Sequence, residues 1–222
     1  MKKHCISIVI LSVVLLLTNC TSYRVSVSSI AQRGVNGQKV YVAPRDSVIS
    51  ENDLQFLEFA KDLKLAISRK GGIIVTDPYE ADQIVLLQYE MSGPQKTSKR
   101  VAEWGPTSVR SSSSSMVFND RSAQGTTYYN YNYGIVGEST IERTEYTRYI
   151  TIVALENEAL KKKIAVQLWQ TTVYSRGSSR DMREVFPVLM VAAEKYIGKT
   201  TKQAVTLEIY EDDSRIEAYR DN

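Results

Sequence analysis

The side chains that most often act in catalysis or bind metals are scarce in this sequence and stand together at one end. The 222 residues contain a single His, His4, and two Cys, Cys5 and Cys20. Beyond Cys20 the chain lacks the groups of a Ser-His-Asp triad or a Cys-His dyad, and the His and thiolate ligands of zinc sites. The sequence therefore predicts no catalytic residue of these classes, no metal site and no cofactor.

Carboxylates are the remaining candidates for acid–base chemistry. Residues four apart on a helix share a face, and four acids stand close together in a segment with helical spacing. They are Glu51, Asp53, Glu58 and Asp62. A glycan hydrolase would need two carboxylates about 5–9 Å apart. We favour the alternative that these acids form a solvated helix face, so we expect no enzyme and keep an envelope glycan hydrolase as the second hypothesis.

The first twenty residues resemble a bacterial export and lipidation signal. Lys2 and Lys3 precede an apolar stretch over 6–17. That stretch is shorter than the roughly 20 residues of a membrane span and is typical of a secretory signal peptide. The segment Leu17-Thr18-Asn19-Cys20 is similar to the bacterial lipoprotein box, although Asn19 replaces the usual Gly, Ala or Ser.

This resemblance implies an address for the protein. It implies that residues 1–19 are a signal peptide and that Cys20 carries palmitate-like acyl chains. Two or three acyl chains hold a protein stably on a membrane, whereas one does not. Thr21 stands where lipoproteins of the inner membrane often carry Asp. The resemblance therefore points to the outer membrane, with the chain facing the periplasm.

The charge balance excludes one class of partner. The formal net charge is +3, and loss of Lys2 and Lys3 would reduce it to +1. A nearly neutral chain with mixed signs lacks the basic face that nucleic-acid binding needs. We therefore expect a membrane partner through Cys20, together with an envelope protein or glycan, and no nucleic acid.

Composition divides the chain beyond the signal into four parts. Residues 20–92 and 146–212 have the periodic apolar patterns of strands and helices, and 213–222 is a polar tail. Residues 93–145 are rich in Ser and Tyr, a low-complexity insertion or a projecting hairpin. The part before Thr126 has little to bury, so we expect disorder or a long loop there.

Within the first part, alternation predicts strands over 23–30, 39–43 and 83–91, with a short apolar strand over 73–75. A helix between them carries an apolar stripe from Phe56 to Ile67, and Asp46 or Ser50 is its expected N-cap.

In the insertion, strands over 126–136 and 142–149 are expected to pair with each other. The second part predicts a strand over 149–155, a turn over 157–161 and an antiparallel strand that begins at Ile164. A helix follows near Asp181, and Pro187 is expected to kink it or to mark its start. A last strand covers 204–210.

The order of these elements predicts an α+β domain. We expect a single mixed, mostly antiparallel sheet with two helices packed on one face. Both halves of the domain contain one helix between strands.

Two segments also resemble an uncharacterised domain family of bacterial envelope lipoproteins. The resemblance covers roughly 39–92 and 147–198. It is carried by the helix end 65–72, the Ala81-Asp82 pair that opens a strand, and the strand 164–169 that ends in Trp169. The family has no assigned activity, so the resemblance implies a fold and a location.

Aromatic residues are the candidates for partner binding, because their rings stack on sugars and fill protein interfaces. They are Trp104, Tyr128, Tyr129, Tyr131, Tyr133 and Trp169. The alternative for Trp169 is a core position, and for the tyrosines a hairpin that packs on itself or a solvated loop. We expect a non-catalytic binding or assembly module of the envelope, with a surface adhesin that presents the tyrosines as a further alternative.

Overall fold

The computed structural model describes residues 22–118 and 122–221, which form two compact units. One unit, here called the core domain, comprises the described residues up to Pro94 and from Glu145 onward. The other, here called the ribbon, spans Gln95–Thr144 and lies within the insertion expected at 93–145. Cys20 and the expected signal peptide over 1–19 lie outside the described residues.

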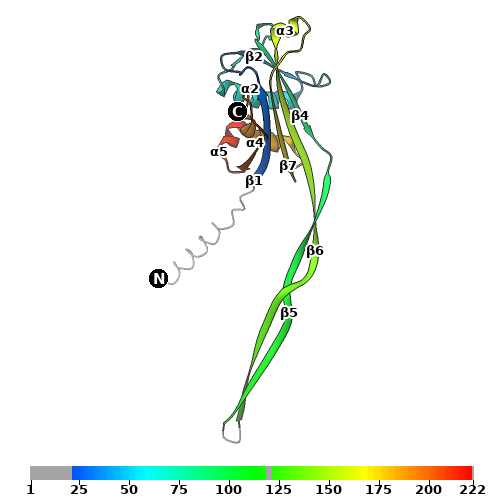
Figure 1. Cartoon of the computed structure of the whole chain (residues 1–222), viewed down its shortest axis with the longest axis vertical. Helices are drawn as coiled ribbons and strands as arrows, with labels where there is room; N and C mark the ends of the chain where they lie inside the picture. Colours follow the sequence, from blue (N-terminus) through cyan, green and yellow to red (C-terminus); the bar gives the residue numbers. More distant parts are fainter. Residues whose placement is uncertain (1–21, 119–121, 222) are drawn as a thin grey trace, which may run out of the picture. The chain divides into compact units, whose positions relative to one another are not determined.

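The core domain is built on one mixed sheet, as the α+β expectation requires (Figure 1). Its strand order is β3-β2-β4-β6-β7-β1-β8, and β5 pairs with β6 in addition. The strands are β1 (Ser22–Ala31), β2 (Lys39–Pro44), β3 (Ile73–Ile74), β4 (Gln83–Met91), β5 (Gln95–Phe118), β6 (Ser122–Glu156), β7 (Gln167–Gly177) and β8 (Val205–Tyr210).

The sheet is less uniformly antiparallel than the sequence indicated. Strand β2 pairs in parallel with both β3 and β4, whereas β4·β6, β6·β7, β7·β1 and β1·β8 are antiparallel. The β2·β3 pair is parallel because α2 (Leu54–Arg69) connects the two strands, and a helical crossover returns the chain in the same direction. The chain then reaches β4 through a connection that contains the 3-10 helix η2 (Pro78–Glu80).

The prediction of two helices is wrong. The described residues contain four α-helices, α2, α3 (Asn157–Lys161), α4 (Met182–Glu194) and α5 (Ser214–Arg220). Figure 1 shows α2, α4 and α5 on the same side of the sheet. There Phe59 of α2 stacks on Phe186 of α4, with ring centroids 4.0 Å apart, and meets Tyr89 of β4 edge-on at 4.8 Å. These rings join the two long helices to the sheet.

Helix α2 begins later than predicted. Its N-cap is Asp53, whose carboxylate accepts a hydrogen bond from the Phe56 amide at 2.9 Å. Ser50 instead accepts from the Asn52 amide in the turn before the helix. At the other end Gly71 adopts a φ of +82°, which ends the helix as expected.

Helix α4 runs through its proline. The helix starts at Met182, and its N-cap Asp181 accepts from the Arg183 amide at 2.9 Å. Pro187 therefore does not mark the start of the helix. The residue is buried within α4. Because proline has no backbone N–H, one hydrogen bond of the helix is missing there.

The connections and the C-terminal segment also differ from the predictions. The turn expected over 157–161 is the short helix α3, and β7 starts at Gln167, which leaves Ile164 exposed before it. The polar tail expected over 213–222 contains α5, whose Ile216 and Tyr219 are buried in the core. These two residues are three apart and therefore share one face of the helix.

The ribbon is a two-stranded antiparallel extension of β5 and β6, joined at 119–121. The disorder or long loop expected before Thr126 is wrong for the described residues, because β5 extends to Phe118 and β6 begins at Ser122. The stretches 126–136 and 142–149 do not pair with each other, since both belong to β6. A run of serines rarely predicts a strand, because serine side chains bury little surface. Here the run belongs to a strand because β5 pairs with β6 through backbone hydrogen bonds.

Candidate functional site

The candidate aromatic residues of the ribbon are all exposed to solvent. Trp104 on β5 is 72% exposed, and Tyr128, Tyr129, Tyr131 and Tyr133 on β6 are 53–70% exposed. Because side chains alternate along a strand, Tyr129, Tyr131 and Tyr133 share one face and Tyr128 lies on the other. No hydrogen bond joins their hydroxyl groups to another described residue. These rings are free to meet a partner.

Side chains tie the two strands of the ribbon together at its middle. Thr107 Oγ1 donates to the Asn132 carbonyl at 3.1 Å, and Asn132 Nδ2 donates to Ser108 Oγ at 3.0 Å. Gly105 lies so close to Val136 that an added Cβ would stand 2.9 Å from a Val136 methyl group. The tyrosine stretch is thus paired closely with β5 on one edge.

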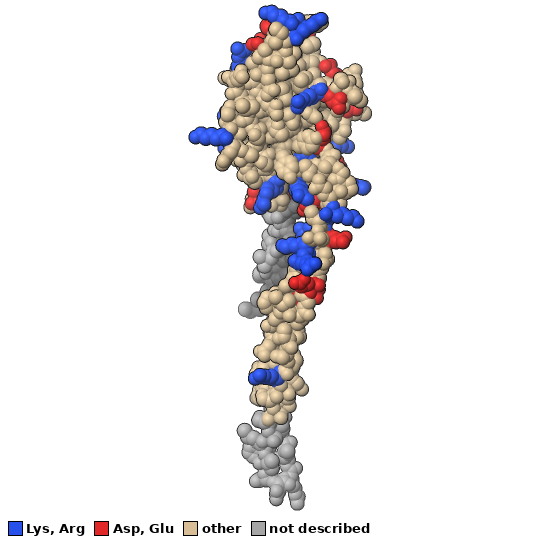
Figure 2. All heavy atoms as spheres, turned by 45° about the vertical axis from the view of Figure 1, so that its right-hand side comes forward, with Lys and Arg blue, Asp and Glu red and all other residues tan. Residues whose placement is uncertain are grey.

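Charge is distributed unevenly along the ribbon. The stretch nearest Gln95 and Thr144 carries charges of both signs, including the exposed ion pair Arg100–Glu138 at 3.9 Å. Beyond Glu103 and before Glu138, the described residues contain one charged side chain, Arg110. Figure 2 shows the same pattern: beyond the stretch with charges of both signs, the described part of the ribbon is mostly tan.

Trp169 is not a surface candidate. Its side chain is 1% exposed, and its Nε1 donates to Gln83 Oε1 at 2.9 Å. Gln83 in turn donates from Nε2 to the Gly34 carbonyl at 2.9 Å. The indole therefore connects β7 to β4 inside the core, and the alternative that the sequence offered for this residue is the correct one.

Sequence analysis missed the environment of Asp62. This residue lies on the buried face of α2 and is only 6% exposed. Burial, and secondarily the neighbouring Glu58 carboxylate, raises the pKa of Asp62 from 3.8 to about 7. The spacing Phe59, Asp62, Ala66 is the signal that could have revealed it, because steps of three and four follow the buried stripe of a helix.

Asp62 borders a hollow of about 200 Å³ between α2, α4 and α5. The neighbouring Glu58 is held by Arg183, whose Nε donates to both carboxylate oxygens at 3.0 and 2.9 Å. Of the other predicted acids, Asp53 caps α2 and Glu51 accepts from the Tyr41 hydroxyl at 2.7 Å. The four acids therefore have separate surroundings, and only Glu58 and Asp62 share a hollow.

A larger hollow of about 530 Å³ lies on the helix-free face of the sheet. Its lining mixes charges of both signs across β6, β7, β1 and β8. Arg176 is paired with Glu145 at 2.8 Å, and Ser22 Oγ donates to Glu208 at 2.8 Å. Arg24 lines the same hollow and makes no ion pair within the described residues.

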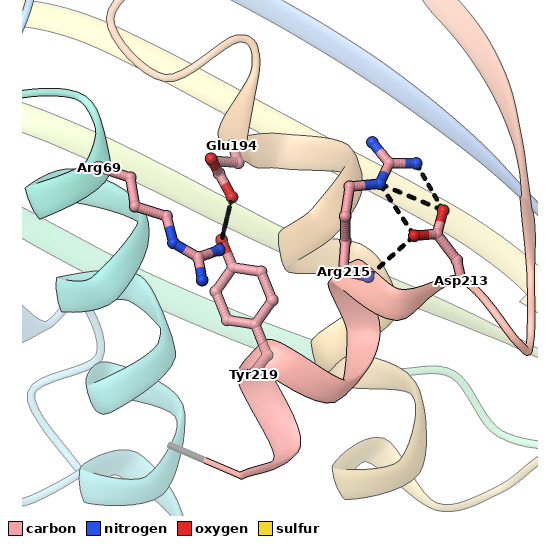
Figure 3. A network of polar contacts seen from close by, with 5 residues as sticks. All are labelled: Arg69, Glu194, Asp213, Arg215 and Tyr219. Carbon is pink, nitrogen blue, oxygen red and sulfur yellow. Dashed lines mark hydrogen bonds and ion pairs between the residues drawn. The ribbon is translucent and has the colours of Figure 1, made fainter.

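Polar contacts fix α5 against the two long helices (Figure 3). The Tyr219 hydroxyl donates to Glu194 Oε2 at 2.6 Å, and Arg69 lies 3.2 Å from the same oxygen. Arg69 also stands over the Tyr219 ring, 5.1 Å from its centroid. Burial and the Glu194 carboxylate raise the pKa of Tyr219 well above its usual range. These contacts join α2, α4 and α5 and have a structural role.

One buried cation stands apart from these contacts. Arg148 of β6 is 1% exposed, and its Nε and Nη2 donate to the Ser179 carbonyl at 3.2 and 3.0 Å. Burial lowers the pKa of Arg148. Its Nη1 and the hydroxyl of Ser175, the residue opposite on β7, have no hydrogen-bond partner among the described residues. The arginine holds the turn after β7 in place.

The described residues contain no candidate metal site and no candidate membrane-spanning helix. Across 22–118 and 122–221, no group of three or more His, Cys, Asp and Glu side chains is placed to hold a metal ion. In the same ranges no helix is both long and apolar enough to cross a membrane.

Comparisons with known proteins give little to set beside this geometry. No known protein family matches the chain, and no curated protein does. Among solved structures, a PDZ domain protein from Parabacteroides distasonis ATCC 8503 is similar with a TM-score of 0.40 and 11% identity. The match covers 88% of this chain and 41% of that one. Neither a fold nor a function follows from a likeness of that size.

Proposed function

We propose that this protein is a non-catalytic binding or assembly module of the bacterial envelope, and that the ribbon is its binding segment. The observation that carries the proposal is the row of exposed tyrosines on an almost uncharged stretch of β6. Aromatic side chains are enriched in protein interfaces and charged ones are depleted from interface centres.

The low stability expected of the ribbon on its own supports this role. An isolated two-stranded hairpin is marginally stable in water, because it has no core of its own. This one exposes Trp104, Val109, Ile135 and Val136 in addition to the tyrosines. A partner that covers these side chains would stabilise the ribbon and gain apolar contact at the same time.

We further propose that the core domain is held at the outer membrane by acyl chains on Cys20, with the chain facing the periplasm. The support is the lipoprotein-like segment 17–20. Strand β1 starts at Ser22, two residues after that cysteine. An anchor at Cys20 would therefore keep the core domain close to the membrane surface, since two extended residues span only about 7 Å.

Substitution of the cysteine tests the anchor. The Cys20→Ala variant should leave the membrane fraction and lose labelling by a palmitate analogue. The matched control is Cys5→Ala, which removes the other thiol and should stay on the membrane. Retention of Cys20→Ala on the membrane at the level of the control would refute the anchor.

Photo-crosslinking tests the binding segment. A photoreactive phenylalanine at Tyr131 should crosslink to a partner in intact cells. The control position is Tyr210 of β8, which is also exposed but lies in the core domain. Equal crosslinking from both positions, or none from Tyr131, would contradict a binding role for the ribbon. Protease treatment of intact cells separates a periplasmic ribbon from the adhesin alternative, because only a surface-exposed ribbon would be cut.

One observation favours the second hypothesis, a carboxylate-dependent glycan hydrolase. Asp62, with a pKa of about 7, would be the general acid and Glu58 the second carboxylate. Against it, the hollow of about 200 Å³ is smaller than the 300–1,000 Å³ typical of ligand pockets, and Arg183 already holds Glu58. Release of sugars from envelope glycan by the purified protein, abolished in Asp62→Asn, would establish this alternative.

A further inference from the structure

Among the described strands, none pairs with one edge of β6 along the ribbon. In the core domain β6 lies between β4 and β7, and β7 pairs with it from Tyr146 onward. Before Tyr146 the described strands pair with β6 only through β5, on the opposite edge. Figure 1 shows β5 and β6 continuing there as a pair. The backbone N–H and C=O groups on the free edge of β6 can therefore pair with another strand.

This edge also lacks the usual protection against pairing. Exposed edge strands commonly carry Lys, Pro or other charged residues that keep foreign strands away. The stretch 122–137 of β6 contains neither a charged residue nor a proline. Protection begins immediately afterwards, with Glu138, Glu142, Arg143 and Glu145. The unprotected part is thus confined to the part of β6 that carries the tyrosines.

We propose that this edge pairs with the same edge of a second copy of the chain. The two β6 strands would run antiparallel about a twofold axis at Asn132, so that two ribbons form one four-stranded sheet. The proposal rests on the proposed binding role of the ribbon and names its partner. In a twofold interface residue i of one copy meets residue j of the other, and residue j meets residue i, so the stretch must complement itself.

The order of residues around Asn132 meets this requirement. With Asn132 opposite Asn132, Tyr131 of one copy lies opposite Tyr133 of the other, and Tyr129 lies opposite Ile135. Aromatic–aromatic and aromatic–β-branched pairs are among the favourable cross-strand neighbours in antiparallel sheets. All side chains from 127 to 137 are uncharged, so within this stretch the register brings no charges into opposition.

The charges further along β6 argue against a twofold axis at Glu138 or Glu142. A twofold axis at Glu138 or Glu142 would place that carboxylate directly opposite its own copy. Like charges in direct opposition destabilise a pair of strands. For two identical chains, the uncharged stretch around Asn132 is therefore the part of this edge where pairing meets the least repulsion.

The test measures the mass of the full chain in detergent, corrected for bound detergent. The parent should have the mass of two chains. Asn132→Lys places two ammonium groups face to face at the axis and should weaken dimerisation at least tenfold. The control is Ser139→Lys, which adds the same charge outside the uncharged stretch and should leave the dimer intact.

A cysteine scan supplies a second readout that does not depend on weakening the interface. Asn132→Cys should form a disulfide between two chains under mild oxidation, because the two side chains lie opposite each other. Ser139→Cys should not, since its two copies would be fourteen residues apart along the paired strands, about 46 Å at about 3.3 Å per residue. The parent chain controls for disulfides through its own cysteines.

The outcomes separate this inference from the proposed function. A parent monomer whose Tyr131 crosslinks to a different protein refutes self-pairing and leaves the binding role standing. A monomer without any crosslink from Tyr131 refutes both. A dimer that is equally stable in Asn132→Lys and lacks the Asn132→Cys disulfide refutes pairing at this edge.

Discussion

Asp62 should make the stability of the core domain depend on pH in an unusual direction. Folding carries this carboxyl from water to the buried face of α2, where its pKa rises from 3.8 to about 7. The folded state therefore binds a proton that the unfolded state releases between these two values. The free energy of unfolding falls with rising pH wherever the unfolded state binds fewer protons than the folded state. For Asp62 this means that stability is lost as the pH rises from about 4 to about 7 and does not recover above it.

The size of the effect follows from the shift. One pKa unit corresponds to about 1.4 kcal/mol, so a shift of about 3 units corresponds to at most about 4 kcal/mol. Burial makes the largest contribution to the raised pKa; the Glu58 carboxylate adds to it and the Lys61 ammonium group opposes it. The other charged groups that line the same hollow are Arg183 on α4 and Arg220 on α5.

Asp62→Asn keeps the shape of the side chain and removes its ionisation. Urea unfolding of the full chain in detergent, followed by tryptophan fluorescence at pH 4.5 and at pH 8, measures the effect. The variant should be more stable than the parent by about 1 kcal/mol at pH 4.5, where the unfolded carboxyl is already mostly ionised, and by up to about 4 kcal/mol at pH 8. Glu142→Gln, which removes an exposed carboxylate from the ribbon, should follow the parent at both values. A variant that loses stability at pH 8, or gains it mainly at pH 4.5, would refute the reasoning.

Two further substitutions test the packing, each against a matched control in urea unfolding. Trp169→Phe leaves the buried Gln83 oxygen without its donor and should cost about 1–3 kcal/mol beyond the lost packing, whereas Trp104→Phe on the ribbon should cost almost nothing. Gly198→Ala should cost more than Gly37→Ala. Both glycines have positive φ, but a Cβ on Gly198 would lie 3.1 Å from the Gly34 backbone, while Gly37 has open space. Equal losses in either pair would contradict these packing assignments.

The elements that the sequence predicted well are those with a regular apolar period. Alternation in β1 and β4 and the stripes of α2 and α4 mark surfaces that face the core, and the structure buries them there. Their positions follow from local pattern alone. The parallel pairs of β2 could not be predicted in this way, because the pattern within a strand does not show which other strand it pairs with.

The sequence-based errors occur where the apolar pattern is absent, very short or interrupted by a charged residue. The ribbon is held by backbone pairing and a few side-chain contacts such as Thr107 with Asn132, so its sequence has no core-facing period to detect. Helix α5 carries its burial on Ile216 and Tyr219 alone. Asp62 falls on the apolar stripe of α2, but a carboxylate is normally assigned to solvent. Sequence patterns identify these exposed tyrosines as candidates, and only the structure separates them from the buried Trp169.

The position of β1 in the sheet has a consequence for biosynthesis. This strand is the first described element, yet its neighbours are β7 and β8, so that Ser22 lies opposite Tyr210. During synthesis β1 would therefore wait, with both edges unpaired, until almost the whole chain had emerged. Contacts between residues so distant in sequence form slowly, because a long loop must close before they stabilise the chain. The core domain should consequently fold late and as a whole, and a chain carried across a membrane in this order would remain unfolded, and able to thread, until its last strand had passed.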